Sequence, residues 1–188
     1  YEPPYPAQIM DWEALAKPLR QQPQVTAAYV QRAMALGWHE PAARALEQAL
    51  EAQWAPELLP LLVQLDASAE PQLLEQRLQR WLHNHPEDPA LLLAAAQIAC
   101  RHQQWPQAQT LLQQALAAGA GAPAWETLGQ LHAAQNDHAR ASQCLLNALR
   151  LQHGEPVQPL EPAMTTATPA AVEQRDQHGL PHLGDDPA

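Results

Sequence analysis

The sequence predicts an all-α fold, a right-handed solenoid of paired antiparallel helices in about four repeated units. Two observations lead to this class: a helix-forming composition and an internal repeat. Of the 188 residues, 37 are Ala, 29 are Leu and 25 are Gln, whereas Phe is absent and Tyr occurs three times. Ala, Leu and Gln are strong helix formers, and the strand-forming residues are scarce. The composition therefore disfavours sheet-based folds, including most α/β enzymes.

The second observation is the repeat, in which similar residues recur at an offset of 33 in the numbering. Twice that offset places Pro23 on Pro89, and the single offset superimposes an Ala-x3-Leu-x2-Ala spacing on itself. The superimposed residues are Ala108, Leu112 and Ala115 on Ala141, Leu145 and Ala148. Small and large apolar residues in this spacing let two helices cross closely. We therefore expect a unit of two helices that recurs along the chain.

The last unit carries the fullest pattern. Its spacing is W-x2-L-G-x2-Y…A-x3-F…A, with His in place of Tyr and Leu in place of Phe. The residues are Trp125, Leu128, Gly129, His132, Ala141, Leu145 and Ala148. This spacing and the period resemble the tetratricopeptide repeat. The resemblance implies units at about 23–54, 55–88, 89–121 and 122–153, preceded by a partial unit at 9–22.

Proline, glycine and apolar periodicity mark the expected helix boundaries. We expect helices at 9–20, 25–36, 41–53, 56–65, 71–83, 89–102 and 106–118, then a last pair around the turn Asn136-Asp137. Gly119 and Gly121 are expected to end a helix, and Asp88 to cap one. Residues 1–8 predict a flexible lead-in. Residues 154–188, rich in proline and acid but poor in apolar side chains, predict a disordered tail.

Charge and segment length exclude several classes of protein. The formal charge is −10, of which residues 154–188 contribute −5, so the chain lacks the basic patch of a nucleic-acid binder. The longest apolar run, Leu91 to Ala96, has six residues. A membrane-spanning helix needs about 20. Glycine-rich phosphate loops are absent. Because the chain begins at Tyr1 rather than at Met, we expect it to be a piece of a longer protein.

Few side chains could support metal binding or catalysis. His83 and His85 lie close in sequence, but a His-x-His spacing points the two rings to different sides of a helix, and no further ligand has metal-site spacing. Cys100 and Cys144 fall in Ala- and Leu-rich stretches and are expected to fill apolar space, with a thiol enzyme at Cys100 as a remote alternative. We therefore predict a non-enzymatic protein without a metal or cofactor.

A surface remains as the candidate site. In a solenoid of helix pairs, the first helices line a concave face that can hold a peptide or helix of a partner protein. Gln31, Gln97 and Gln130 share one repeat position, where amides could bond an extended backbone; mere solvation of the helices is the alternative. The expected partner-binding residues are Gln31, Met34, Leu59, Val63, Leu93, Gln97, Arg101, Glu126, Gln130 and Ala134.

Three segments, 80–95, 105–116 and 124–149, carry a closer resemblance. The most specific pattern is W-L-x-x-H-P-x-D-P-A-L-L-L, which begins at Trp81. Over about residues 9–151 the chain resembles the C-terminal tetratricopeptide domain of the HemY family, proteobacterial inner-membrane proteins encoded with haem-biosynthesis genes. The resemblance implies a membrane hairpin preceding this chain, a domain on the cytoplasmic face and a scaffold role late in haem or porphyrin metabolism. A haem-pathway enzyme would be the partner. It does not imply a flavin-dependent oxidase, because no flavin fingerprint is present.

Two other interpretations stay open. The domain could carry haem or a porphyrin, using His132, His102 or tryptophan side chains. It could also be a tetratricopeptide adaptor in envelope assembly, for lipopolysaccharide or for cytochrome c maturation. The lipopolysaccharide relatives normally end in a C-x-x-C metal module, which is missing here.

Overall fold

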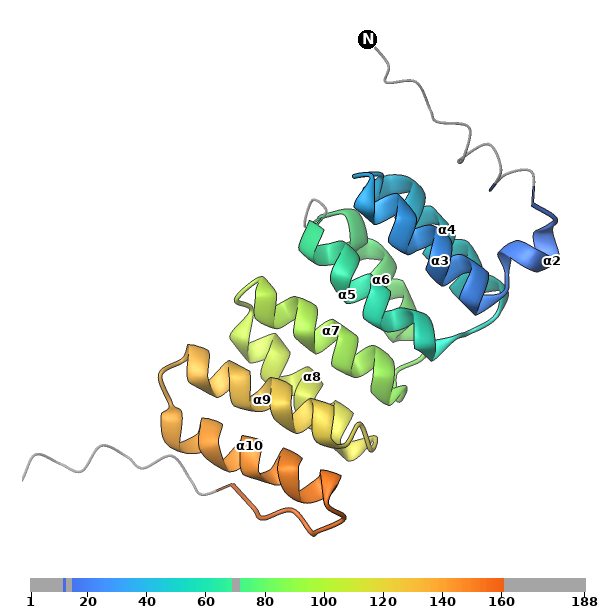
Figure 1. Ribbon diagram of the computed structural model, residues 1–188. Helices are drawn as coiled ribbons and strands as arrows, with labels where there is room; N and C mark the ends of the chain where they lie inside the picture. Colours follow the sequence, from blue (N-terminus) through green and yellow to red (C-terminus); the bar gives the residue numbers. More distant parts are fainter. Residues whose placement is uncertain (1–11, 13–14, 69–71, 161–188) are drawn as a thin grey trace, which may run out of the picture. The chain divides into compact units, whose positions relative to one another are not determined.

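The computed structural model describes residues 12, 15–68 and 72–160, without the side chains of residues 67, 68, 72 and 73. These residues form helices joined by turns and include no β-strand, which confirms the predicted all-α class (Figure 1). By compactness the chain divides into two units, Tyr1–Gln158 and Pro159–Ala188. Only residues 159–160 of the second part are described, so all the described helices belong to the part Tyr1–Gln158. The predicted lead-in at 1–8 and most of the predicted tail lie outside the described residues.

Each helix predicted after residue 23 is present, with ends shifted by at most three residues. In the labels of Figure 1, the helices are α2 Lys17–Arg20, α3 Pro23–Ala35, α4 His39–Ala52, the short 3-10 helix η1 Pro56–Leu58, α5 Leu59–Ser68, α6 Gln72–Asn84, α7 Pro89–Arg101, α8 Trp105–Ala117, α9 Ala122–Ala134 and α10 His138–Gln152.

The helices begin at regular intervals that equal the offset of the sequence repeat. The first members of successive pairs, counting η1 with α5, start at Pro23, Pro56, Pro89 and Ala122. The second members start at His39, Gln72, Trp105 and His138. In three of the pairs the two helices are joined by three-residue turns, at 36–38, 102–104 and 135–137. The sequence repeat therefore has a structural counterpart of the same length.

Local chemistry explains where the helices begin. Pro23, Pro56 and Pro89 each occupy the first turn, where the missing proline N–H leaves no hydrogen bond unmade and the fixed φ suits the helix. Before α7, Asp88 Oδ1 accepts a hydrogen bond from the Leu91 backbone N–H at 2.9 Å. This is the predicted aspartate cap, and it satisfies one of the donors that a helix start leaves free.

Local chemistry also explains where five helices end. Each is followed by a residue with φ between +58° and +89°: Gly37, Gln103, Gly119, Asn136 and Gly154. After each of these residues, the next backbone N–H donates to the carbonyl five residues earlier, as Asp137 does to His132 at 2.9 Å. This left-handed termination favours glycine or asparagine. Gly119 ends α8 as predicted, whereas Gly121 instead stands immediately before α9.

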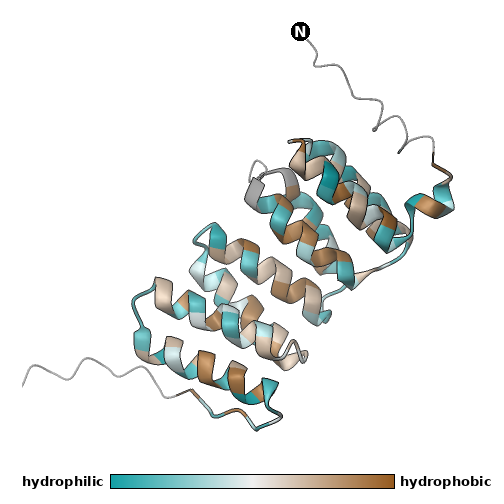
Figure 2. Cartoon of the chain, viewed as in Figure 1, coloured by the Kyte–Doolittle hydropathy of each residue, from teal (hydrophilic) through white to brown (hydrophobic). Residues whose placement is uncertain are grey.

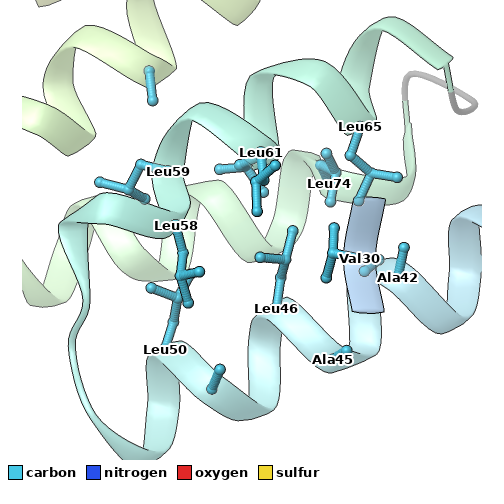
Figure 3. Packing of buried hydrophobic residues seen from close by; sticks show 14 of the residues in the cluster. Val30, Ala42, Ala45, Leu46, Leu50, Leu58, Leu59, Leu61, Leu65 and Leu74 are labelled. Carbon is cyan, nitrogen blue, oxygen red and sulfur yellow. The ribbon is translucent and has the colours of Figure 1, made fainter. Parts of the chain in front are cut away.

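Aliphatic side chains fill the space between the helices. Figure 3 shows Val30 of α3, Leu46 of α4, and Leu58 and Leu65 of η1 and α5 converging on one another. All four are at most 1 % exposed. Burying each such side chain contributes about 1.5–3 kcal/mol relative to leaving it in water. The helices from α3 to α7 share this core, which ends with Leu91, Ala94 and Ile98 of α7.

The crossing of α9 and α10 is close because the residues there are small. A Cβ atom on Gly129 would lie 3.2 Å from the Ala141 carbonyl oxygen and 3.1 Å from Leu145 Cγ. This confirms the predicted roles of Gly129 and Ala141. Leu145, which was predicted to fill the space beside them, does contact the glycine but stays 44 % exposed.

A tryptophan links the first helix pair to the third. Trp54 Nε1 donates to Asp88 Oδ2 at 2.8 Å, so the carboxylate that caps α7 also binds the residues after α4. The Trp54 ring stacks on His85 with a centroid separation of 3.8 Å. His85 therefore packs against an aromatic ring, which is a structural role.

Two predictions at the ends of the domain need correction. The helix predicted at 9–20 is interrupted, because Leu15 and Ala16 are not helical and α2 starts only at Lys17. Pro18 accounts for the break, since a proline ring clashes with the carbonyl four residues earlier in a continuous helix. Residues 9–11 and 13–14 lie outside the described residues.

The second correction concerns the start of the predicted tail. Residues 155–160 have no regular secondary structure, yet the buried Asn147 side chain binds the Gln158 backbone twice. Asn147 Nδ2 donates to the Gln158 carbonyl at 2.7 Å, and the Gln158 N–H donates to Asn147 Oδ1 at 2.8 Å. The chain is thus fixed on α10 as far as Gln158, five residues past the predicted boundary at 153.

Polar and apolar residues mix along every helix in Figure 2, with a band of exposed leucines on α10. These are Leu145, Leu146, Leu149 and Leu151. Among the helices that the structure describes, none combines the length and the apolar character that crossing a bilayer requires.

Candidate partner-binding face

Four glutamines mark one face of the first helices. Gln31, Gln64, Gln97 and Gln130 lie on α3, α5, α7 and α9 at the repeat interval, so each is the ninth residue from the start of its unit. These helices are neighbours in the order α3, α5, α7, α9 (Figure 1). Gln31, Gln64 and Gln130 are exposed, and Gln97 is half-buried. We call the surface around these four residues the glutamine face.

The face is hollowed between α3 and α5. A shallow cavity of about 390 Å³ is lined by Gln31, Met34, Ala35 and Gln64. Met34 and Ala35 supply an apolar surface, with an amide side chain at each border. An amide carries donors and an acceptor, as a peptide group does. The hollow can therefore accept an apolar side chain while the amides bond the backbone that carries it.

A long side-chain contact links α7 to α9 on the glutamine face. Gln97 Nε2 lies 3.4 Å from Thr127 Oγ1, and Thr127 in turn donates to the Pro123 carbonyl at 2.9 Å. The first of these distances is long for a hydrogen bond, so little free energy is lost if a ligand displaces Thr127 from the Gln97 amide. The amide is therefore positioned by its neighbour and still available for exchange.

Most of the predicted partner-binding residues lie on this face. Gln31, Gln130 and Ala134 are exposed. Met34, Leu93, Gln97 and Glu126 are half-buried, and Glu126 Oε1 accepts a hydrogen bond from Gln152 Nε2 at 3.0 Å.

The prediction for α5 is wrong by one residue. Leu59 is 1 % exposed and belongs to the core, so it cannot touch a partner. Val63 is half-buried and packs against the same core. The positions equivalent to Leu93 and Gln97 in the preceding unit are Pro60 and Gln64, and both are exposed. Gln64 was missed, although the repeat offset alone would have found it.

Arg101 is also used differently from the prediction. Its Nη1 donates to the Val63 carbonyl at 2.7 Å and lies 3.0 Å from Asp66 Oδ2. The Asp66 side chain is 1 % exposed, and His102 Nε2 contacts its other oxygen at 3.0 Å. A buried carboxylate is costly unless it is paired and hydrogen-bonded. Arg101 and His102 therefore brace α7 against α5, and Arg101 is not a free contact for a partner.

Cys144 and His132 are buried, whereas Cys100 is half-buried. Burial raises the pKa of the Cys144 thiol to about 11 and also raises the pKa of Cys100. Both therefore stay protonated at neutral pH, which disfavours a nucleophilic thiolate. His132 is 4 % exposed, and its pKa is lowered mainly by burial. Within the described ranges, no three His, Cys, Asp or Glu side chains come together in a way that could hold a metal ion.

Comparison with known proteins assigns no relative. No protein-family model matches the chain, and neither a curated protein nor a solved structure matches it significantly.

Proposed function

We propose that this chain is a non-enzymatic protein-binding module, a tetratricopeptide-like solenoid that holds an extended segment of a partner protein on its glutamine face. The main support for this proposal is a glutamine that recurs at one position of four neighbouring helices, as Gln31, Gln64, Gln97 and Gln130. Support for the solenoid comes from the regular spacing of the helix starts and from the small residues at the α9–α10 crossing.

The binding mode follows from the chemistry of the face. An extended segment exposes backbone N–H and C=O groups in alternation, and each glutamine amide can serve either kind. The hollow at Met34 and Ala35 then takes one side chain of the segment. Because the amides are neutral, they bond a backbone without requiring a charged sequence.

A finer proposal rests on the family resemblance of residues 9–151. On that basis, the domain belongs to a HemY-like protein anchored in a bacterial inner membrane, faces the cytoplasm, and binds an enzyme of haem or porphyrin synthesis. The alternative of a haem carrier has less support. His102 Nε2 is already engaged by the buried Asp66, and His132 is only 4 % exposed, so neither histidine offers a free, accessible Nε2 to a haem iron.

The test compares two pairs of glutamine substitutions with the same change of charge. The full chain is immobilised, a captured protein is identified, and its Kd is measured by calorimetry. The double substitution Gln64→Glu and Gln97→Glu should weaken binding about tenfold or more. Each glutamate lacks the N–H donors of glutamine, and its negative charge repels the backbone carbonyl oxygens of the partner.

The control pair is Gln113→Glu with Gln114→Glu, on the exposed surface of α8. It should leave Kd unchanged. If the control pair weakens binding as much as the pair on the glutamine face, the partner binds elsewhere or responds only to net charge.

A further inference from the structure

The helix α6 breaks the repeat pattern of the second helices. Where α4 has Ala42 and Leu46, the equivalent positions of α6 in the next unit hold Glu75 and Gln79. Ala42 and Leu46 are fully buried, whereas Glu75 and Gln79 are exposed. Burying a charged side chain and an amide side chain between two closely packed helices would cost their solvation free energy. The sequence therefore turns a different side of α6 toward the core.

The structure shows which side that is. Leu74 and Trp81 of α6 are 2 % and 3 % exposed. Ion pairs join the helix to α4: Arg77 Nε lies 2.8 Å from Glu47 Oε2, and Arg80 Nη1 lies 3.1 Å from Glu47 Oε1. One edge of α6 is thus fastened to α4, while its other edge faces α7 and α8.

A cleft of about 230 Å³ lies between this second edge of α6 and the helices α7 and α8. Leu78 and Leu82 of α6 form one wall, and Ala95 and Ala99 of α7 lie on the floor. Gln107 of α8 is part of the opposite border. Since pockets for drug-sized ligands usually measure about 300–1,000 Å³, this cleft is suited to a single large side chain.

The cleft does not open on the glutamine face. Its floor residues Ala95 and Ala99 are each two positions from Gln97 along α7. Two positions in a helix correspond to a rotation of about 200°. Gln97 therefore points to the other side of α7, and a ligand in the cleft leaves the glutamine face open.

Charge selects the kind of ligand. Two carboxylates, Asp66 and Glu75, line the cleft together with His102, and no Lys or Arg is among the described lining residues. Asp66 is already neutralised by Arg101 at 3.0 Å. Glu75 is exposed and forms no ion pair with any residue that the structure describes.

We propose that the α6–α7–α8 cleft is a second peptide site, which takes one aromatic side chain of a partner segment with a basic residue beside it. The ring packs between Leu78, Leu82 and the alanine floor, where it loses contact with water. The adjacent cation lies near Glu75. The site recognises a short aromatic–basic motif, independently of the extended segment assigned to the glutamine face.

The test titrates three blocked tetrapeptides into the full chain. Binding is monitored through the backbone amide NMR signals of the chain. The peptides are Ala-Arg-Trp-Ala, Ala-Glu-Trp-Ala and Ala-Arg-Ala-Ala. The first should give saturable shifts in residues 74–82 and 95–107 below about 5 mM. The second should bind about threefold more weakly, as expected for one exposed charge pair, and the third should give no saturable shift. Absence of saturation with the first peptide, or equal binding of all three, overturns the proposal.

Variants localise the ligand on the chain. Glu75→Gln should remove the difference in affinity between the first two peptides, because the interaction of Glu75 with the peptide arginine is then absent. The control Glu87→Gln, in the loop before α7, should preserve that difference. Leu78→Ala should weaken the first peptide about tenfold, while Leu149→Ala on α10 should not. If preference for the Arg peptide survives Glu75→Gln, the site has been misplaced. Since the peptide series uses the unaltered chain, a folding defect in a variant leaves the test intact.

Discussion

At the residue scale, the left-handed turn residues carry unequal strain. Gly37, Gly119 and Gly154 occupy three of the five left-handed helix ends, Asn136 occupies a fourth, and Gln103 the fifth with φ +58°. A non-glycine residue other than Asn or Asp costs about 1–2 kcal/mol there. Glycine avoids that strain but loses about 0.5–1 kcal/mol through greater freedom of the unfolded chain.

We therefore predict that Gln103→Gly stabilises the domain by about 0.5–1 kcal/mol and raises Tm by about 2 °C. Gln103 is exposed, so no side-chain packing is lost. Calorimetric melting of the two chains measures the shift. Gln113→Gly, inside α8, serves as the control and should instead destabilise by about 1 kcal/mol. A lower Tm for Gln103→Gly would show that the left-handed turn is not strained.

A second residue-scale prediction concerns His132. Burial lowers its pKa from the ordinary value of 6.5, Asp137 opposes the shift, and Arg140 adds to it. The unfolded chain therefore binds the His132 proton more tightly than the folded chain does. As pH falls through 6.5 and below, this difference favours the unfolded state, so stability is lost on acidification.

The measurement compares Tm at pH values on either side of that range for the natural chain and for His132→Gln. The loss of Tm on acidification should be smaller in the variant, because its amide does not titrate. The other histidines contribute equally to both chains and cancel. Identical losses in the two chains would mean that His132 takes up its proton equally well in the folded state.

At the element scale, the approach of α9 to α10 depends on one glycine. A Cβ at Gly129 would meet the Ala141 carbonyl, a backbone atom that moves only if α10 moves. We predict that Gly129→Val lowers the free energy of unfolding by about 2 kcal/mol, as overpacking in a crossing does. Urea unfolding measures this difference.

The control substitution for that crossing is Ala133→Val, on the same helix but exposed. It introduces the same side chain without the clash and should cost about 0.5 kcal/mol from helix propensity alone. If the two substitutions cost the same, the helices are not in close contact at Gly129.

At the scale of the whole molecule, the sequence was sufficient for the repeat and for most helices. The repeat offset, the first-turn prolines and the Asp88 cap are local signals, and the structure has helices where they predict them. The face of α5 was misjudged because residues 58–65 are apolar almost all round, so periodicity does not distinguish one side from another. Leu59 was therefore chosen where the offset selects Pro60.

Other features depend on partners distant in the sequence. Arg101 contacts Asp66, 35 residues away on another helix, and no local pattern predicts that a charged residue will be buried there. The cleft beside α6 likewise results from Glu75 and Gln79, which look like ordinary surface residues until α6 is placed on α4. The helices follow from local sequence signals, whereas the contacts that assign roles to their polar side chains depend on how the helices pack.

Site-specific photo-crosslinking can decide whether a partner binds across the glutamine face. A benzophenone amino acid is placed in the full chain either at position 64, on α5, or at position 113, on α8. Both positions are exposed glutamines, so their reactivity toward solvent is matched. We expect a partner adduct from position 64 and none from position 113. An adduct at position 113 as strong as the one at position 64, or no adduct at either position, would rule out binding across the glutamine face.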